Sequence, residues 1–542
     1  MPLRAKDLME QRERSGATAL VEQLVREGTE VVFGIPGIHL MPVLDALHGY
    51  GDRVRFVTTR HEQATAFMAD GYARVSGQPG VSLVVPGPGV YNAATGLATA
   101  YAASSPFLQI AGQVSRAAIG RGMSVPHEVH DQLDIVRPVT KSAERVTSAD
   151  DLPRAVHDAF AAMRSGRPRP THLEAPPEAF SDLTAAPLLD PAGRVEPEID
   201  EERLAAAAGL LAGAQRPLVV AGGGIHAADA AAELTELAEF LQAGVITTRE
   251  GKGAVDERSP LSLGTLFVHQ RLRPAIADAD VVLAVGTRFQ GVPLAARQKL
   301  VHLDVDAAEI GRYGPVAVAL VADARTGLRR LLDALRARRE PAADRTAELR
   351  AVRAAVDEQH MAVGPQAQIV QALRRAVPED GILAVDATMV GYMCHLAFPV
   401  YRPRSYLTSS YMGTLGFAFT MALGAKIAAP DRPVLSVSGD GGFLFNAGEL
   451  ATAVQYGLNT VSVVFNDSAY GNTRLDQISG YGGRIIGTEL RNPDFVAYAE
   501  SFGAVGVRVK TPDDLAAAVR EAFTDSRPVV VEMPLQQLPS AF

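Results

Sequence analysis

The sequence predicts an α/β protein of three consecutive domains, each built on a doubly wound parallel sheet. Short apolar runs rich in β-branched residues alternate with longer amphipathic segments along most of the 542 residues. That alternation is typical of parallel strands joined by crossover helices. Two irregular, Pro-containing stretches, 183–200 and 336–345, interrupt it and are interpreted as linkers. We therefore expect domains at 1–182, 195–337 and 360–535.

The first domain opens with a helix for which Ser15 is a suitable N-cap and Gly28 a suitable end. The apolar runs that follow each lead into a turn or directly into a helix, as the strands of a parallel sheet do. The expected helices are 16–27, 63–75 and 91–103, and the expected strands are 31–33, 54–58, 81–85 and 107–111.

The second and third domains show the same alternation. Three consecutive glycines, 222–224, follow the first strand expected in the central domain. The central domain is expected to contain helix 201–213 and strands 217–221, 245–248, 281–285 and 300–305. The third domain is expected to contain strands 381–385, 433–438 and 460–465, with helix 446–456 between the last two.

Composition excludes several classes of protein. The formal net charge is −9 and no long basic run occurs, which argues against nucleic acid as the main partner. The lone cysteine, Cys394, excludes a disulfide framework and a cysteine-based metal site, and it fits a reducing compartment. The amino terminus is polar, and no uninterrupted apolar segment is long enough to span a membrane. We therefore expect a cytoplasmic protein with no membrane partner.

The most informative stretch lies between residues 433 and 467. A buried strand leads into Gly439-Asp440-Gly441-Gly442, and the next strand ends at Asn466-Asp467. Carboxylates at the ends of two neighbouring parallel strands lie where the ligands of such sheets bind. Glycines let the backbone approach a ligand closely, and carboxylate oxygens suit Mg²⁺. The stretch therefore predicts a Mg²⁺ that also holds a diphosphate.

This stretch resembles the diphosphate-binding motif of the thiamine diphosphate (ThDP) enzymes, which runs from Gly-Asp-Gly to an Asn-Asn pair. Asp467 lies 27 residues after Asp440 and stands where the family usually has Asn. The resemblance implies that Asp440, Asp467 and the carbonyl oxygen of Ala469 bind Mg²⁺. It also implies that the cofactor is bound by Gly441, Gly442, Tyr470 and Gly471, and by the segment that contains Thr388 and Val390.

Two further motifs resemble the same family. The stretch Arg60-His61-Glu62-Gln63-Ala64 is similar to its activating-glutamate motif, which makes Glu62 the group that exchanges a proton with N1′ of the cofactor's pyrimidine ring. The plainer alternative is a glutamate that stabilises a helix N-terminus. The stretch 413–417 resembles Gly-x-(Met/Leu/Ile)-Gly-Phe, in which Gly413 and Leu415 contact the cofactor and Leu415 is the apolar wedge that keeps it bent. The alternative for Leu415 is ordinary core packing.

The acetolactate synthase-like branch is the nearest resemblance, supported by the segments 32–37, 87–89, 112–114, 137–141 and 251–254. It implies an enzyme that decarboxylates a 2-oxo acid and transfers the acyl carbanion to an acceptor carbonyl. The chain departs from biosynthetic acetolactate synthases because it has no Trp and reads Pro126-His127-Glu128 where they have Phe-Gln-Glu. We therefore expect a different substrate pocket.

Other activities stay open. The acids of pyruvate decarboxylases, including an adjacent His-His pair, are missing. We name His39, Gln113 and His127 as the catalytic candidates on the substrate side, and His130 as a further candidate on the same loops. The alternatives are a non-ligating 2-oxo acid decarboxylase, a 2-hydroxyacyl-CoA lyase with a basic cleft in its central domain, a silent homologue, and a flavin or nicotinamide oxidoreductase.

Cofactor and assembly follow from the same resemblance. Some relatives bind FAD or an ADP-containing molecule in the central domain and others bind nothing there, so the glycines 222–224 leave this open. In the family, one chain's first domain holds the pyrimidine ring and another chain's third domain holds the diphosphate. We therefore expect a homodimer or homotetramer with active sites at the subunit interface.

Overall fold

The computed structural model describes residues 13–266 and 271–541. The interpretation of the amino terminus as free of a signal segment falls mostly on residues 1–12, outside the described part. The described chain forms three six-stranded parallel sheets with helices around them, which confirms the α/β prediction. It divides into two compact units. The first unit is Met1–Val195, Tyr411–Pro430 and Asn446–Leu458, and the second unit is Glu196–Ser410, Asp431–Phe445 and Asn459–Phe542.

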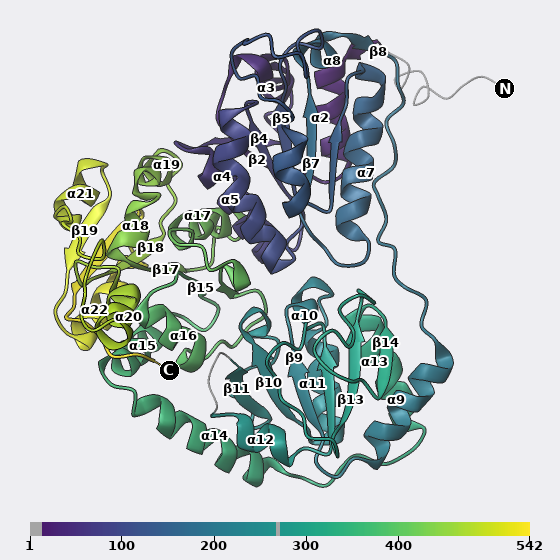
Figure 1. Ribbon diagram of the computed structural model, residues 1–542, viewed down its shortest axis with the longest axis vertical. Helices are drawn as coiled ribbons and strands as arrows, with labels where there is room; N and C mark the ends of the chain where they lie inside the picture. Colours follow the sequence, from purple (N-terminus) through teal and green to yellow (C-terminus); the bar gives the residue numbers. More distant parts are fainter. Residues whose placement is uncertain (1–12, 267–270, 542) are drawn as a thin grey trace. The chain divides into compact units, whose positions relative to one another are not determined.

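The first unit is built on a sheet in the order β3-β2-β4-β5-β7-β6, in which every pairing is parallel. Helices α2, α3 and α7 pack against one face, while α4 and α5 pack together on the other (Figure 1). The strands are β2 (Val31–Gly34), β3 (Arg55–Thr58), β4 (Gly80–Val84), β5 (Phe107–Gly112), β6 (Ser142–Arg145) and β7 (Thr171–Ala175). The helices are α2 (Gly16–Arg26), α3 (Met41–Gly49), α4 (Glu62–Ser76), α5 (Pro88–Ala103) and α7 (Leu152–Arg164).

Two segments from late in the chain complete the first unit. Helix α17 (Ala418–Ala428) lies against α4 with their backbones almost touching. A methyl group added to Gly424 would lie 2.0 Å from the carbonyl oxygen of Met68, and one added to Gly71 would lie 2.2 Å from that of Met421. Any side chain at either glycine would push the helices apart. The second segment is a 3₁₀ turn, Ala447–Glu449, followed by α19 (Leu450–Gln455), so the single helix predicted over 446–456 is wrong in detail.

The central sheet of the second unit has the strand order β11-β10-β9-β12-β13-β14. This is the order of dinucleotide-binding folds, with its switch point between β9 and β12. The strands are β9 (Leu218–Ala221), β10 (Gly244–Thr248), β11 (Ser262–Leu266), β12 (Val281–Val285), β13 (Lys299–Asp304) and β14 (Val318–Val321). The main helices are α9 (Glu201–Gly213), α11 (Ala231–Leu241) and α13 (Ala324–Arg336), with α10 (Gly224–Ala227) and α12 (Arg273–Asp278) short.

The last sheet has the order β16-β15-β17-β18-β20-β19, which repeats the topology of the first sheet. Its strands are β15 (Ile382–Val385), β16 (Tyr406–Leu407), β17 (Val434–Gly439), β18 (Val461–Asn466), β19 (Val505–Arg508) and β20 (Val529–Pro534). Its helices are α15 (Pro365–Ala376), α16 (Met389–Ala397), α18 (Asp440–Leu444), α20 (Gly471–Gly480), α21 (Phe495–Ser501) and α22 (Pro512–Ala522). The Gly-rich turn expected at 439–442 is therefore the start of a short helix.

The interpretation of 183–200 as an irregular linker needs one correction. Residues Leu183–Thr184 form strand β8, which pairs antiparallel with β1 (Arg14–Ser15). Farther along, the buried carboxylate of Glu27 accepts the backbone N–H of Ala192. The first part of this segment is thus bound along the first unit by strand pairing and hydrogen bonds. A second element that the sequence analysis missed is α14 (Thr346–Met361), a helix that follows the linker 336–345.

Candidate active site

Two carboxylates come together at the carboxyl edge of the last sheet. In the parallel pairing of β17 with β18, Gly439 is the register partner of Phe465. Asp440 begins α18 directly after Gly439, and Asp467 follows the end of β18, so the register brings the two acids to the same edge. Asp440 is buried. The structure thus brings together the two acids that the sequence analysis assigned to Mg²⁺.

The environment of these carboxylates favours a cation. Burial, and then the charge of Asp440, raise the pKa of Asp467 to about 6. Burial also raises the pKa of Asp440 above its ordinary value. Two carboxyl groups, one buried and one half-buried, that disfavour each other's ionisation are stabilised when a positive ion lies between them. Their oxygens are the donors that Mg²⁺ prefers, so the residues present fit that ion.

Asn492 is a member of this cluster that the sequence analysis missed. Its Nδ2 donates to Oδ2 of Asp440 at 2.5 Å and to Oδ1 of Asn466 at 2.9 Å. The amide therefore bridges the ends of β17 and β18 and helps to hold Asp440 in place. Asn492 lies 52 residues beyond Asp440, in a segment of irregular structure, and no motif marked it.

The residues after β18 wrap around the pair. The backbone N–H of Ala469 hydrogen-bonds to both carboxylates, while the assignment of its carbonyl oxygen to the metal stays a prediction. A methyl group at Gly471 would lie 2.4 Å from Oδ2 of Asp467, and one at Gly441 would lie 2.6 Å from the ring of Tyr470. These two glycines are needed for close packing of the site. Gly442 is buried in α18 next to them.

The loop after β15 adjoins the same edge. In this sheet the strand order reverses between β15 and β17, and ligands of open α/β sheets bind at such switch points. The side-chain oxygen of Thr388 lies 3.4 Å from where a methyl group on Gly439 would be. Val390 is fully buried in the first turn of α16. Thr388 is therefore beside Gly439, as its predicted cofactor role requires.

In the first unit, Glu62 begins α4 and its carboxylate is half-buried. Its Oε2 accepts a hydrogen bond of 2.9 Å from Nδ2 of Asn92 on α5. The preceding backbone is fixed by Glu449, which is buried and accepts the N–H groups of Arg60 at 2.9 Å and of His61 at 3.0 Å. Neither Asn92 nor Glu449 was identified from the sequence. Both are distant in the chain from the activating-glutamate motif.

Leu415 also belongs to the first unit. The flanking glycines, Gly413 and Gly416, have φ values of 65° and 75°, which the left-handed region allows glycine to adopt without strain. The carbonyl of Gly416 accepts a hydrogen bond of 2.6 Å from Nδ2 of Asn446. This loop fixes a half-buried Leu415 in a tight bend, which suits an apolar wedge.

His39 and His127, 88 positions apart in the sequence, form a pair. Their ring centroids lie 4.8 Å apart in an edge-to-face arrangement. The Nδ1–H of His127 donates to the carbonyl of Pro86 at 3.1 Å, which leaves its Nε2 as the atom with a lone pair. Burial, and then His127, lower the pKa of His39. His39 comes from the turn after β2 and Pro86 follows β4, so the pair lies at the switch point of the first sheet.

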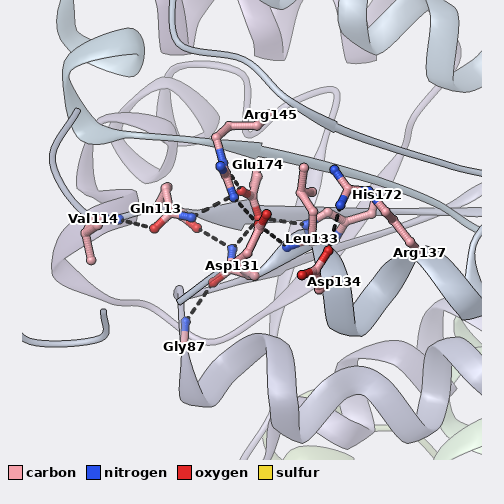
Figure 2. Close-up of polar contacts among 12 residues, drawn as sticks. Gly87, Gln113, Val114, Asp131, Leu133, Asp134, Arg137, Arg145, His172 and Glu174 are labelled. Atoms are coloured by element: carbon pink, nitrogen blue, oxygen red, sulfur yellow. Dashed lines mark hydrogen bonds and ion pairs between the residues drawn. The ribbon is translucent and has the colours of Figure 1, made fainter. Parts of the chain in front are cut away.

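Gln113 is placed differently from what its predicted role requires. Its side chain is buried and turned toward Glu174, to which Nε2 donates at 3.1 Å, while Oε1 accepts the N–H of Val114 at 2.7 Å (Figure 2). Both ends of the amide are therefore occupied by the protein. These contacts give Gln113 a structural role, and a direct catalytic role for it stays a prediction. His130 is exposed on the same loop as His127.

The glycines 222–224 at the switch point of the central sheet have a packing function. A methyl group at Gly222 would lie 2.2 Å from the carbonyl oxygen of Gly286, and one at Gly224 would lie 2.5 Å from the Cα of Gly286. The two turns thus touch backbone to backbone. Close packing explains these glycines, so they carry no argument for a bound dinucleotide, and FAD stays undecided.

Within residues 13–266 and 271–541, no helix is both long and apolar enough to cross a membrane. In the same residues, no group of three or more His, Cys, Asp or Glu side chains is arranged to hold a metal ion. The metal site predicted at Asp440 and Asp467 has only two such side chains, and its third ligand is a backbone carbonyl, so it has fewer acidic side chains than such a group.

Family models match the three parts of the chain in order. Residues 14–136 match the N-terminal TPP-binding domain of thiamine pyrophosphate enzymes, residues 204–331 match their central domain, and residues 386–533 match their C-terminal TPP-binding domain. Thiamine pyrophosphate is ThDP under its other name. The fold, the site and these matches define an enzyme that uses this cofactor.

Similar proteins align over nearly the whole chain. A probable 2-ketoarginine decarboxylase of Pseudomonas aeruginosa is 38% identical over 96% of this chain and 94% of its own. A probable acetolactate synthase large subunit of Methanocaldococcus jannaschii is 35% identical over 97% and 93%, and the acetolactate synthase large subunit of Haemophilus influenzae is 33% identical over 94% and 92%. The chain belongs to the thiamine diphosphate enzyme family, in its acetolactate synthase-like branch.

The carboxylate pair generates a first prediction. Asp440→Ala should abolish retention of ThDP in the presence of Mg²⁺, because the diphosphate would lose the cation that it shares with the protein. Asp467→Asn keeps an oxygen ligand and removes one of two repelling charges, so it should bind ThDP within about tenfold of the unaltered protein. Isothermal titration calorimetry with both variants checks this. Tight binding of ThDP and Mg²⁺ by Asp440→Ala would show that the metal lies elsewhere.

Proposed function

We propose that the protein is a ThDP- and Mg²⁺-dependent enzyme that decarboxylates a 2-oxo acid and transfers the resulting acyl group to an acceptor carbonyl. The observation that carries the cofactor part is the mutually repelling pair of Asp440, which is buried, and Asp467, which is half-buried, at neighbouring strand ends. The acyl transfer is supported by similarity to acetolactate synthases.

The roles of the residues follow from their placement. ThDP supplies, when bound, a nucleophilic carbon, C2 of its thiazolium ring, and a positively charged ring that takes up the electron pair left when a 2-oxo acid loses CO₂. Asp440, Asp467 and the carbonyl of Ala469 would hold the Mg²⁺, and Gly441, Gly442, Tyr470, Gly471, Thr388 and Val390 would hold the diphosphate. Glu62 would move a proton to and from N1′ of the pyrimidine ring. Leu415, with Gly413 beside it, would keep the cofactor bent.

A non-ligating decarboxylase is the second candidate. The sequence analysis found the usual acids of aldehyde-releasing relatives missing, but the structure supplies a histidine pair from two distant loops, His39 and His127. The tautomer of His127 leaves Nε2 able to take up and deliver a proton. Delivery of that proton to the carbon that lost CO₂ would release an aldehyde. Similarity to a probable 2-ketoarginine decarboxylase supports this candidate.

The 2-hydroxyacyl-CoA lyase alternative has less support. It calls for a basic cleft in the central domain, but the arginines of α13 are neutralised by carboxylates. Arg325 and Arg329 pair with Glu233, Arg330 pairs with Glu201, and Arg336 pairs with Glu236.

Product analysis distinguishes the candidates. The protein is incubated with ThDP, Mg²⁺ and a panel of 2-oxo acids that includes pyruvate and guanidino acids, and products are identified by mass spectrometry. We expect a ligated 2-hydroxy ketone or acid. Release of an aldehyde alone would favour the second candidate, and His127→Gln should then slow that release by about 10²–10⁴-fold. No CO₂ from any 2-oxo acid, together with cleavage of a 2-hydroxyacyl-CoA, would contradict both.

Glu62→Gln tests proton transfer directly. The amide keeps the size of the side chain but cannot exchange a proton with N1′, so ThDP should still bind while exchange of the C2 hydrogen for deuterium slows by about 10²–10⁴-fold. Quenched-flow exchange followed by proton NMR measures this rate without any substrate. The matched control is Glu22→Gln, which changes a partly buried carboxylate of the same unit that accepts the Tyr50 hydroxyl and pairs with Arg14. Exchange at the unaltered rate in Glu62→Gln would remove Glu62 from this role.

The assembly is also a proposal. Glu62 and Leu415 belong to the first unit and the metal carboxylates belong to the second, and the family resemblance implies that two chains complete one site. We infer a homodimer or homotetramer. Mixing Glu62→Gln chains with Asp440→Ala chains under conditions of subunit exchange should restore activity, because a hybrid dimer contains one site with both residues intact. A fully active monomer in sedimentation experiments would contradict the shared site.

A further inference from the structure

A buried carboxylate in the first sheet has no place in the proposed chemistry. Glu174 on β7 is completely buried and accepts three short hydrogen bonds (Figure 2). They come from Gln113 Nε2 at 3.1 Å, from Gln132 Nε2 at 2.7 Å and from Arg145 Nε at 2.5 Å. Nε2 of His172 lies 3.4 Å from the same group. A buried carboxylate with this many donors is a fixed anchor for the side chains that reach it.

The anchor stays charged at neutral pH. Burial opposes ionisation, but hydrogen bonds and charges from His172 and Arg145 outweigh it and lower the pKa of Glu174. Arg145 lies on β6, next to β7, and also forms an ion pair of 2.5 Å with Asp131. Removing the charge or one donor would leave a buried polar group without its partner, which is costly.

Gln132 connects this anchor to two loops. Its Oε1 accepts the N–H of Gly87 at 2.8 Å, and its Nε2 donates to the carbonyl of Gly112 at 3.1 Å as well as to Glu174. Gly87 follows β4 and Gly112 ends β5. One fully buried amide therefore ties the carboxyl ends of two neighbouring strands to each other.

Those two loops support the histidine pair. A methyl group at Gly87 would lie 2.6 Å from the carbonyl oxygen of His127, so His127 rests directly on the Gly87 turn. A methyl group at Gly112 would lie 3.1 Å from Cβ of His39. His127 itself has a φ of 69°, an unfavourable value for a non-glycine residue that persists only when its surroundings impose it.

The segment after His127 is tied down a second time. Asp131 forms an ion pair with Arg145, and its Oδ1 also accepts a hydrogen bond of 3.1 Å from the N–H of Leu133. The loop from His127 to Leu133 is thus held by two adjacent side chains, Asp131 and Gln132, that both lead to the Arg145–Glu174 pair.

We propose that Gln132 is a positioning residue for the substrate-side histidines: anchored on Glu174, it fixes the Gly87 and Gly112 turns and so holds His127 against His39. The proposal rests on the proposed function only where it assigns a substrate-side role to His127. Gln132 touches neither substrate nor cofactor in this scheme. It acts by fixing the backbone on which the two imidazoles lie.

Gln132→Met tests the proposal, because methionine keeps the length of the side chain and removes both hydrogen-bonding ends. The matched control is Gln109→Met, which removes a buried amide of the same sheet that bonds His172 and neither loop. Hydrogen exchange at the Gly87 amide should become about tenfold faster in Gln132→Met and stay unchanged in the control.

Two measurements separate positioning from mere support of the fold. NMR titration of labelled histidines without substrate should show the pKa of His39 rising toward its ordinary value, because His39 becomes less buried and His127 has moved away. With substrate, kcat should fall by about 10²-fold with a changed pH profile, while C2 exchange on ThDP stays at the unaltered rate because Glu62 is untouched.

The outcomes are distinguishable from a failure of the proposed function. If no 2-oxo acid is turned over, the Gly87 exchange and the His39 titration still decide the proposal. Faster exchange at Gly87 with an unchanged His39 titration would overturn it, as would equal effects from Gln109→Met. If Gln132→Met does not fold, Gln132→Asn is measured in the same way, because its shorter amide cannot reach Gly87, Gly112 and Glu174 together.

Discussion

Repulsion between two carboxylates, one buried and one half-buried, is the constraint on which the carboxyl edge of the last sheet depends. Asp440 and Asp467 are brought together by the parallel register of β17 and β18, and burial makes their common ionisation unfavourable. The groups that hydrogen-bond to the two carboxylates include the neutral amide of Asn492 and the backbone N–H of Ala469, and Arg474 adds a positive charge near Asp467. Such partners reduce the repulsion without cancelling it, so the negative charge that remains favours a cation at this edge of the sheet.

The same topology occurs twice with different residues at its switch point. The first and last sheets share one strand order, with the switch point between β2 and β4 in one and between β15 and β17 in the other. The last sheet places carboxylates and glycines there, which suits a metal and phosphates. The first sheet places the histidine pair there, which suits proton transfer to a small substrate. The central sheet has a different order, and its switch point is closed by glycine turns packed against each other.

What could be predicted from the sequence was local. Alternating strands and helices gave the three sheets, and short motifs gave Glu62, Asp440 and Asp467, because each follows a strand by a fixed, local pattern. Asn492, Glu449 and Gln132 were missed, since each acts through a partner that is distant in the chain, and the motifs assign no role to any of the three positions. The pairing of His39 with His127 could not be predicted either, because it depends on which strands are neighbours. The prediction of one helix over 446–456 was wrong because residues 447–449 adopt 3₁₀ geometry. Glu449, at the end of that turn, accepts the backbone N–H groups of Arg60 and His61, which precede Glu62.

The close contact of α4 with α17 has a consequence for biosynthesis. The first unit is assembled from three separate stretches of chain, and the helix that covers α4 is translated only after the whole central domain has been made. Until then, the face of α4 around Met68 and Gly71 stays open on the ribosome, and contacts of such large sequence separation form slowly. The nascent chain therefore leaves this face of α4 uncovered for most of its synthesis, and a fragment ending at Val195 would lack the helix that covers it.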